Sequence, residues 1–209
     1  MIQYEKLSVK PLKSLWNRLK LMGNFEELHG IILSHYTEAT RYYHHIQHIM
    51  RGLTELDLVK SMVSHYDLME YARWYHDVIY DVNASDNEWK SAELACEHAT
   101  KYGLTDNSLI IIRNCIMATR HHDIPKTPEE KVICDVDLSI FGQDPSEFHQ
   151  YEKDIRKEYS HISAHQFNRG RKVILEYFLN KDSIYHTDYF RDKYEKKARE
   201  NLSNALLKL

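Results

Sequence analysis

The chain has 209 residues, with 28 Lys and Arg against 31 Asp and Glu, for a formal net charge of −3. This length suffices for one domain with a sizeable buried core. The basic residues are dispersed except near 191–199. The composition therefore argues against a surface that binds a nucleic-acid duplex.

The sequence shows no sign of membrane insertion or of secretion. No apolar run approaches the roughly 20 residues that span a bilayer, and the N-terminal stretch lacks the apolar block of a signal peptide. We therefore expect a cytoplasmic protein with no membrane partner. Cys96, Cys115 and Cys134 are odd in number, lack CxxC spacing and have apolar neighbours, so they are expected to be reduced core residues.

Apolar residues recur mostly at intervals of three and four, and only six Gly and four Pro interrupt the chain. This pattern is typical of an all-α protein. In chain order, the predicted helices cover 11–22, 24–36, 44–56, 58–66, 68–81, 86–102, 106–121, 128–141, 145–159, 163–180 and 186–208. We expect a single domain over 1–209, with a motif-bearing core at about 40–142 and a C-terminal helical extension over 145–209.

The first informative stretch is 42–52, YYHHIQHIMRG. Within the predicted helix 44–56, His44 and His48 are four residues apart and so share one face. Two imidazoles on one face can serve one metal ion, or one can bind metal while the other donates a proton. A half-exposed polar stripe is the alternative.

The central stretch is 72–88, ARWYHDVIYDVNASDNE. His76 and Asp77 are adjacent within an apolar predicted helix, and burying such a pair is costly unless a group such as a divalent metal satisfies it. Asp81 shares a face with Asp77 if the helix runs that far. Glu88 is either a first-turn charge that complements the helix dipole or an active-site residue.

Two later stretches add candidate residues. The predicted helix over 106–121 ends in Arg120 and His121, and His122 follows directly. Basic residues at a helix C-terminus ordinarily complement the dipole, although an enzyme acting on phosphate esters also needs cationic groups near its metal. Further on, Asp135 and Asp137 interrupt an apolar helix, so at least one carboxylate is expected to be buried with a partner such as a histidine-bound metal.

The ordered set His48, His76, Asp77 and Asp137 resembles the H…HD…D pattern of the HD-domain superfamily of metal-dependent phosphohydrolases. The segments YHHIQH, AxWYHDVIYD, DNExxSA, ATRHH and DVDLSIFG occur in order and resemble a bacterial branch of predicted HD-superfamily phosphohydrolases. Weaker similarity extends to the C-terminus. The resemblance implies an HD-type helical bundle with additional N- and C-terminal helices.

The resemblance also implies a ligand set. His48, His76, Asp77 and Asp137 are expected to bind a divalent metal, which is Mn, Mg, Co, Fe or Ni. Asp135 is the alternative to Asp137. Whether one or two metals bind stays open at this stage.

Catalytic roles are implied by the same kind of match. Residues 43–48 resemble the YHNxxH segment of cyclic nucleotide phosphodiesterases, in which the first His protonates the leaving oxygen, so His44 is the expected general acid. His45 stands where those enzymes carry Asn. Asp81 falls where the superfamily's stringent-response hydrolases carry an acidic residue, which implies a water-orienting role, although Tyr80 replaces their preceding Glu.

The expected activity is hydrolysis of a nucleotide or other small phosphate ester by a metal-activated water. His121, His122, Glu88 and Arg120 are candidates for a second metal or for phosphate contacts. The alternatives are an HD-type di-iron oxygenase, with His121 or His122 as extra ligands, and a non-catalytic regulator that binds a nucleotide or metal. The expected partner is a small phosphorylated substrate, and a homodimer stays open; specificity depends on pocket shape and is not readable from the sequence.

Overall fold

The computed structural model describes residues 2–121 and 124–209, and the side chains of 8–121 and 124–209. The described residues form ten α-helices and two short 3-10 helices and contain no strand, so the prediction of an all-α chain is confirmed. Within these residues, no helix has both the length and the apolar character needed to cross a membrane. The three cysteines are buried, as predicted.

The chain divides into two compact units, Met1–Ile133 and Cys134–Leu209. The first unit contains α1 (Ile2–Arg18), α2 (Phe25–Tyr36), α3 (Ile46–Leu58), the 3-10 helix η1 (Lys60–Met62), α4 (Tyr66–Tyr75), α5 (Asn87–Lys101) and α6 (Asp106–Ala118). Helix α7 (Pro128–Asp137) begins in this unit and continues past its end.

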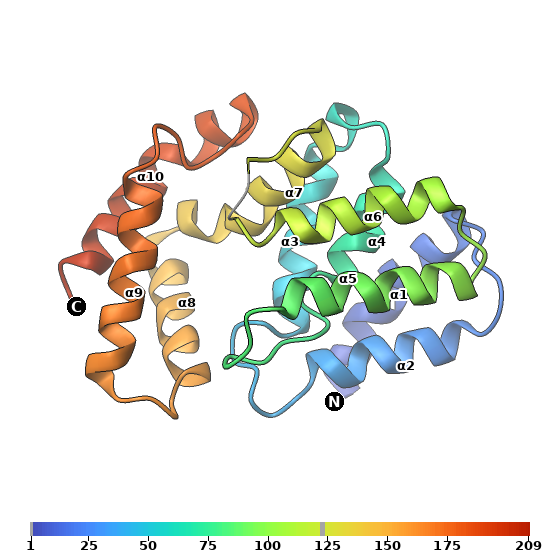
Figure 1. Ribbon diagram of the computed structural model, residues 1–209, viewed down its shortest axis with the longest axis horizontal. Coiled ribbons are helices and arrows are strands. Elements are labelled where there is room, and N and C mark those ends of the chain that lie inside the picture. Colours follow the sequence, from blue (N-terminus) through green and yellow to red (C-terminus); the bar gives the residue numbers. More distant parts are fainter. Residues whose placement is uncertain (1, 122–123) are drawn as a thin grey trace. The chain divides into compact units, whose positions relative to one another are not determined.

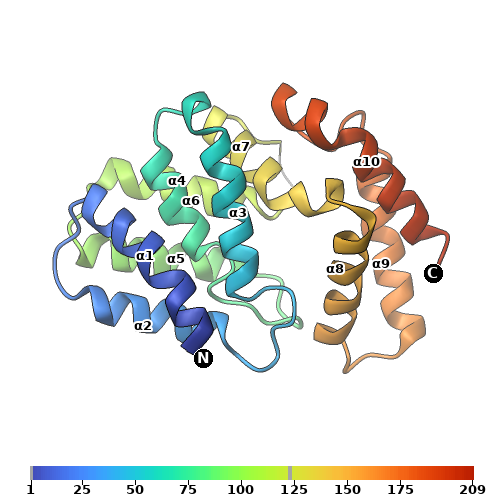
Figure 2. The same cartoon turned by 180° about the vertical axis from the view of Figure 1, so that it is seen from behind.

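Helix α4 is the centre of the first unit. It contacts α1, α3, α5 and α6, and every residue from Met69 to Tyr75 is buried. A helix that is buried on all sides has no polar face, so the two charged residues in this stretch, Glu70 and Arg73, must find partners inside the protein. Figure 1 shows α5 and α6 side by side, and Figure 2 shows α3 and α4 together from behind.

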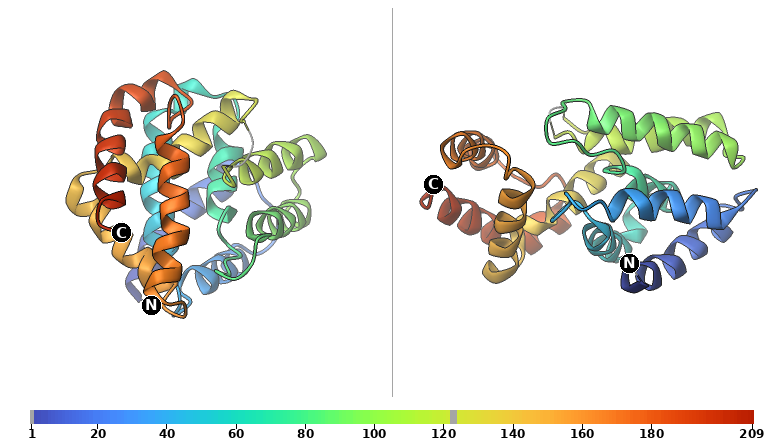
Figure 3. Two further views of the ribbon diagram at one scale, coloured as in Figure 1. Left: turned by 60° about the vertical axis from the view of Figure 1, so that its left-hand side comes forward. Right: turned by 90° about the horizontal axis from the view of Figure 1, so that it is seen from below.

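The second unit contains η2 (Leu138–Gly142), α8 (Pro145–Glu158), α9 (Ala164–Leu179) and α10 (Asp188–Leu206). Helix α10 packs against η2 and α9, and Figure 3 shows the pair α9 and α10 from two sides. The approach at η2 is close, because a Cβ atom on Gly142 would lie 2.4 Å from Cβ of Tyr194. The side chain of Asn201 donates to the carbonyl oxygens of Phe141 at 2.8 Å and Gln143 at 2.9 Å.

Several helix boundaries differ from the predicted ones. Helix α1 begins at Ile2, nine residues before the predicted start at 11, and contains Pro11 in its interior. The predicted helix 58–66 is wrong, because only η1 forms there and Val63 is extended. Helix α4 ends at Tyr75, six residues before the predicted end at 81, so Asp77 and Asp81 do not share a helical face.

Asp135 is buried for a structural reason. Its carboxylate accepts hydrogen bonds from the backbone N–H of His186 at 2.7 Å, and from the N–H at 2.8 Å and hydroxyl at 2.7 Å of Thr187. Thr187 is the N-cap of α10. Burial raises the pKa of Asp135 to about 6, although these hydrogen bonds lower it. This carboxylate therefore has partners without a metal.

We predict that Asp135→Asn destabilises the protein by about 1–3 kcal/mol, because an amide replaces one acceptor oxygen with a donor that faces other donors. Urea or thermal unfolding measures the change. Asp192→Asn, at an exposed position of α10, is the matched control and should change stability by less than about 0.5 kcal/mol. Equal effects of the two substitutions would contradict the anchoring role.

Candidate metal centre

Three donor atoms of the first unit lie within hydrogen-bonding distance of one another. His48 lies on α3, and His76 and Asp77 directly follow the last residue of α4. The two Nε2 atoms are 3.1 Å apart, and Oδ2 of Asp77 lies 2.8 Å from Nε2 of His76 and 3.3 Å from Nε2 of His48. Both imidazoles are buried.

The hydrogen-bond partners assign the imidazole tautomers. Nδ1 of His76 lies 2.9 Å from the carbonyl oxygen of Arg73, which can only accept, so Nδ1 carries the proton. The guanidinium of Arg73 can only donate, and its Nη1 lies 2.9 Å from Nε2 of His76 and its Nη2 3.0 Å from Nε2 of His48. Both Nε2 atoms therefore present lone pairs.

The carboxylate of Asp77 adds a third acceptor. Burial alone would raise its pKa, but the imidazoles of His76, His48 and His44, when protonated, outweigh that effect and hold the pKa of Asp77 well below its usual range. With neutral imidazoles, a metal ion at the same place would supply the positive charge that keeps the carboxylate ionised. Three acceptors that converge in this way repel one another unless a cation lies among them.

The spacing suits a metal ion. Two ligand atoms that each lie about 2.1 Å from an ion, with an angle of about 90° between them at the ion, are about 3.0 Å apart. The three donor atoms here are separated by 2.8, 3.1 and 3.3 Å. The backbone carbonyl that accepts from Nδ1 of His76 is a usual partner of a metal-bound histidine. The donor set and its supporting contact thus fit a divalent ion.

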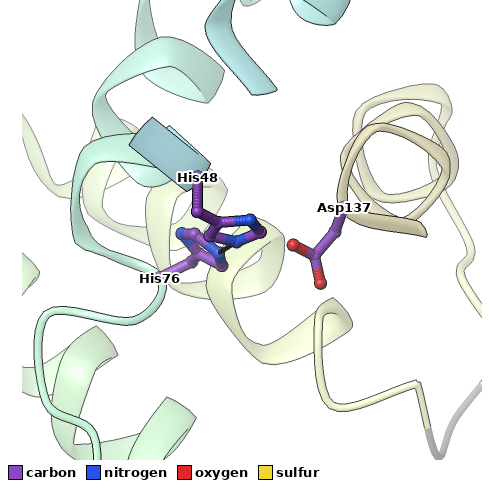
Figure 4. Close-up of side chains that lie close together, drawn as sticks. All are labelled: His48, His76 and Asp137. Carbon is purple, nitrogen blue, oxygen red and sulfur yellow. Dashed lines mark hydrogen bonds between the residues drawn. The ribbon is translucent and has the colours of Figure 1, made fainter. Parts of the chain in front are cut away.

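Asp137, the last residue of α7, offers a ligand atom near the two histidines. His48, His76 and Asp137 each have one ligand atom within 4.8 Å of the others. Figure 4 shows the carboxylate of Asp137 turned toward the two imidazole rings. The described residues therefore contain a histidine and aspartate group that could hold a metal ion.

Arg41 joins the chain segments that carry these candidate ligands. Its side chain is 1% exposed, and its guanidinium donates to the carbonyl oxygens of His44 at 3.2 Å, Asp77 at 2.6 Å and Val78 at 2.9 Å. Carbonyl groups at a helix C-terminus have no partner within the helix. Arg41 donates hydrogen bonds to the carbonyl oxygens just beyond α4, and it also bonds the segment that leads into α3. It thereby connects the two segments.

Helix α5 fixes the residues that follow Asp77. The hydroxyl of Ser91 accepts from the N–H of Ile79 at 3.0 Å and donates to its carbonyl oxygen at 3.3 Å. The amide of Asn87 accepts from the N–H of Asp81 at 3.0 Å and donates to its carbonyl oxygen at 2.9 Å. The DNExxSA segment, at the start of α5, thus fixes the loop after α4 through these four hydrogen bonds.

His44 lies beside the cluster, although it is not on the helix. Because α3 begins at Ile46, the expected shared helical face with His48 does not exist. The two rings are nonetheless 5.7 Å apart, and the ring of His44 stacks on Tyr80 with centroids 4.1 Å apart. His45 is the N-cap of α3, and its Nδ1 accepts from the N–H of Gln47 at 3.0 Å.

Asp81, the expected water-orienting residue, forms a local turn. Its Oδ1 accepts from the backbone N–H of Asn83 at 2.9 Å and from its side-chain amide at 3.2 Å. The residue is exposed. These contacts account for the carboxylate in the structure, and its catalytic role stays a prediction.

The candidates for a second metal or for phosphate lie on other elements. Glu88 is half-buried in the first turn of α5. Arg120 and His121 follow the end of α6, and His121 has a positive φ of 56°. Among the described residues, neither Glu88 nor His121 joins the cluster of His48, His76 and Asp137. His122 lies outside the described residues.

Sequence reasoning missed the two buried arginines. Arg73 was detectable, because it interrupts the same apolar stretch that draws attention to His76 and Asp77. Arg41 stands directly before the YYHH segment, but its burial depends on contacts with residues about 36 positions away in the chain. A sequence pattern on one helix does not report such a contact.

Comparisons of the chain with protein-family models, with curated proteins and with solved structures found no match. Inference about function therefore depends on the residues and their geometry.

We predict that Arg41→Lys destabilises the protein by about 2–4 kcal/mol and weakens metal binding, because an ammonium group cannot reproduce the planar fork that joins three carbonyl oxygens. Thermal unfolding and calorimetric titration with Mn²⁺ measure the two effects. Arg113→Lys, at a surface ion pair with Glu93, is the control. Wild-type stability and affinity in Arg41→Lys would contradict the tethering role.

Proposed function

We propose that the chain is a divalent-metal-dependent phosphohydrolase of the HD-domain type, acting on a nucleotide or another small phosphate ester. The observation that carries this proposal is the convergence of two imidazole Nε2 atoms and a carboxylate oxygen at 2.8–3.3 Å. The same residues supply the H…HD part of the superfamily pattern. Asp137, in the matching position of that pattern, supports it further.

His48, His76, Asp77 and Asp137 are the proposed ligands. Neutral imidazole and ionised carboxylate are suitable donors for Mn, Co, Fe, Ni and, through the oxygens, Mg. A divalent ion bound there supplies a water ligand of lowered pKa and offsets the negative charge of phosphoryl oxygens.

His44 is the proposed proton donor to the leaving oxygen. Its ring is half-buried and held by the stack on Tyr80. Its ring centroid lies 5.7 Å from that of His48, so the imidazole is placed beside the proposed metal ligands, where a proton donor to the leaving oxygen is needed.

The two alternative functions find less support. A di-iron oxygenase needs further ligands, and of its two candidates His121 does not join the cluster while His122 lies outside the described residues. A regulator without turnover would keep the metal ligands but not depend on the proton donor. The experiments below separate it from an enzyme.

The direct test measures metal content and phosphate release from a panel of nucleotides and sugar phosphates with Mn²⁺, Mg²⁺, Co²⁺, Fe²⁺ or Ni²⁺. Asp77→Ala should lose bound metal and all release, because the ion then loses an anionic ligand beside the two imidazole nitrogens. Asp188→Ala, whose side chain is 89% exposed, should retain both. Absence of release from folded, metal-loaded protein across the panel would contradict the phosphohydrolase proposal.

His44→Gln provides a second test once a substrate is found. We predict that kcat falls by about 10²–10⁴-fold, because a positioned general acid typically contributes that much, while metal content stays at the wild-type level. Steady-state kinetics and elemental analysis give the two values. A variant with wild-type kcat would exclude His44 as the proton donor.

A further inference from the structure

We propose that Arg73 is a built-in competitor for the metal, because its guanidinium donates to the same Nε2 atoms of His48 and His76 that are the proposed ligands. The inference rests on the proposed metal-binding function and adds a residue that controls affinity. It assigns a role to a buried charge that neither the superfamily pattern nor the proposed chemistry uses.

The competition follows from the number of lone pairs. A neutral imidazole has one lone pair in its ring plane, and that lone pair serves either a hydrogen-bond donor or a metal ion. Nη1 of Arg73 lies 2.9 Å from Nε2 of His76, and Nη2 lies 3.0 Å from Nε2 of His48. Metal binding through both nitrogens therefore requires the guanidinium to give up both hydrogen bonds.

The guanidinium is firmly held where it competes. Arg73 is 1% exposed, and Nη2 also donates to the carbonyl oxygen of His48 at 2.9 Å. The permanent positive charge further opposes a divalent cation at the same donors. An ion must displace two hydrogen bonds and tolerate this charge, so the bound metal is held less tightly than the four ligands alone would hold it.

Gly52 makes room for this arrangement. A Cβ atom at this position of α3 would lie 2.1 Å from Nε, 2.5 Å from Cζ and 2.6 Å from Nη2 of Arg73. These atoms form the far end of a flexible side chain, so a methyl group there would move the guanidinium and not the backbone. Gly52→Ala is therefore a way to shift the guanidinium without removing it.

The test compares the affinity for Mn²⁺ and Co²⁺ of wild-type protein, Arg73→Leu and Gly52→Ala by isothermal titration calorimetry. Arg73→Leu should bind about tenfold more tightly or better, because two competing hydrogen bonds are lost. Gly52→Ala should change affinity in the same direction, and the double variant should not exceed Arg73→Leu. Arg113→Leu, on the surface, should match the wild type.

The direction of the change separates competition from a structural role. If Arg73 only supported the fold, its loss would loosen the ligands and weaken metal binding. Circular dichroism and thermal unfolding verify that each variant is folded, and Gly52→Ala carries the test if Arg73→Leu does not fold. Unchanged or weaker affinity in folded variants would overturn the competition while leaving the metal site in place. No metal binding by any of the proteins would overturn both proposals.

Discussion

The main constraint on the first unit is that three hydrogen-bond acceptors converge at the end of α4 and need a positive charge to offset their mutual repulsion. Two neutral imidazole nitrogens and an ionised carboxylate oxygen lie 2.8–3.3 Å apart, an arrangement that is unfavourable inside a protein without a compensating cation. Arg73 supplies one positive charge from α4 itself, and a divalent ion is the other cation that suits the donors. The chemistry proposed for the chain follows from this local excess of acceptors.

The surrounding structure keeps the acceptors together. Helix α4 is buried from Met69 to Tyr75 and in contact with four other helices, so its C-terminal end cannot move freely. Arg41 joins the carbonyl oxygens beyond that end to the segment before α3, and Ser91 fixes the next turn. The proposed ligands are thus held in place by groups that take no part in the proposed chemistry.

Much of the fold was predictable from spacing, and part of the candidate site was not. Apolar periodicity gives the helical class and the approximate position of most helices, and an His-Asp pair in an apolar stretch points to buried chemistry. The end of α4 at Tyr75 was not predictable, because Arg41 satisfies the carbonyls of Asp77 and Val78 through a contact distant in sequence. Periodicity also could not show that Asp135 is engaged by the N-terminus of α10, nor that Gly52 admits the guanidinium of Arg73.

The central claim is that His48 and His76 bind one divalent ion through their Nε2 atoms. X-ray absorption spectroscopy of the Co²⁺-loaded protein tests it most directly, because imidazole rings give a characteristic outer-shell scattering pattern. The account predicts two imidazole nitrogens and oxygen ligands at about 2.0–2.2 Å, with the imidazole signal halved in His48→Ala. A spectrum with oxygen ligands alone, identical in the wild type and in this variant, would contradict it.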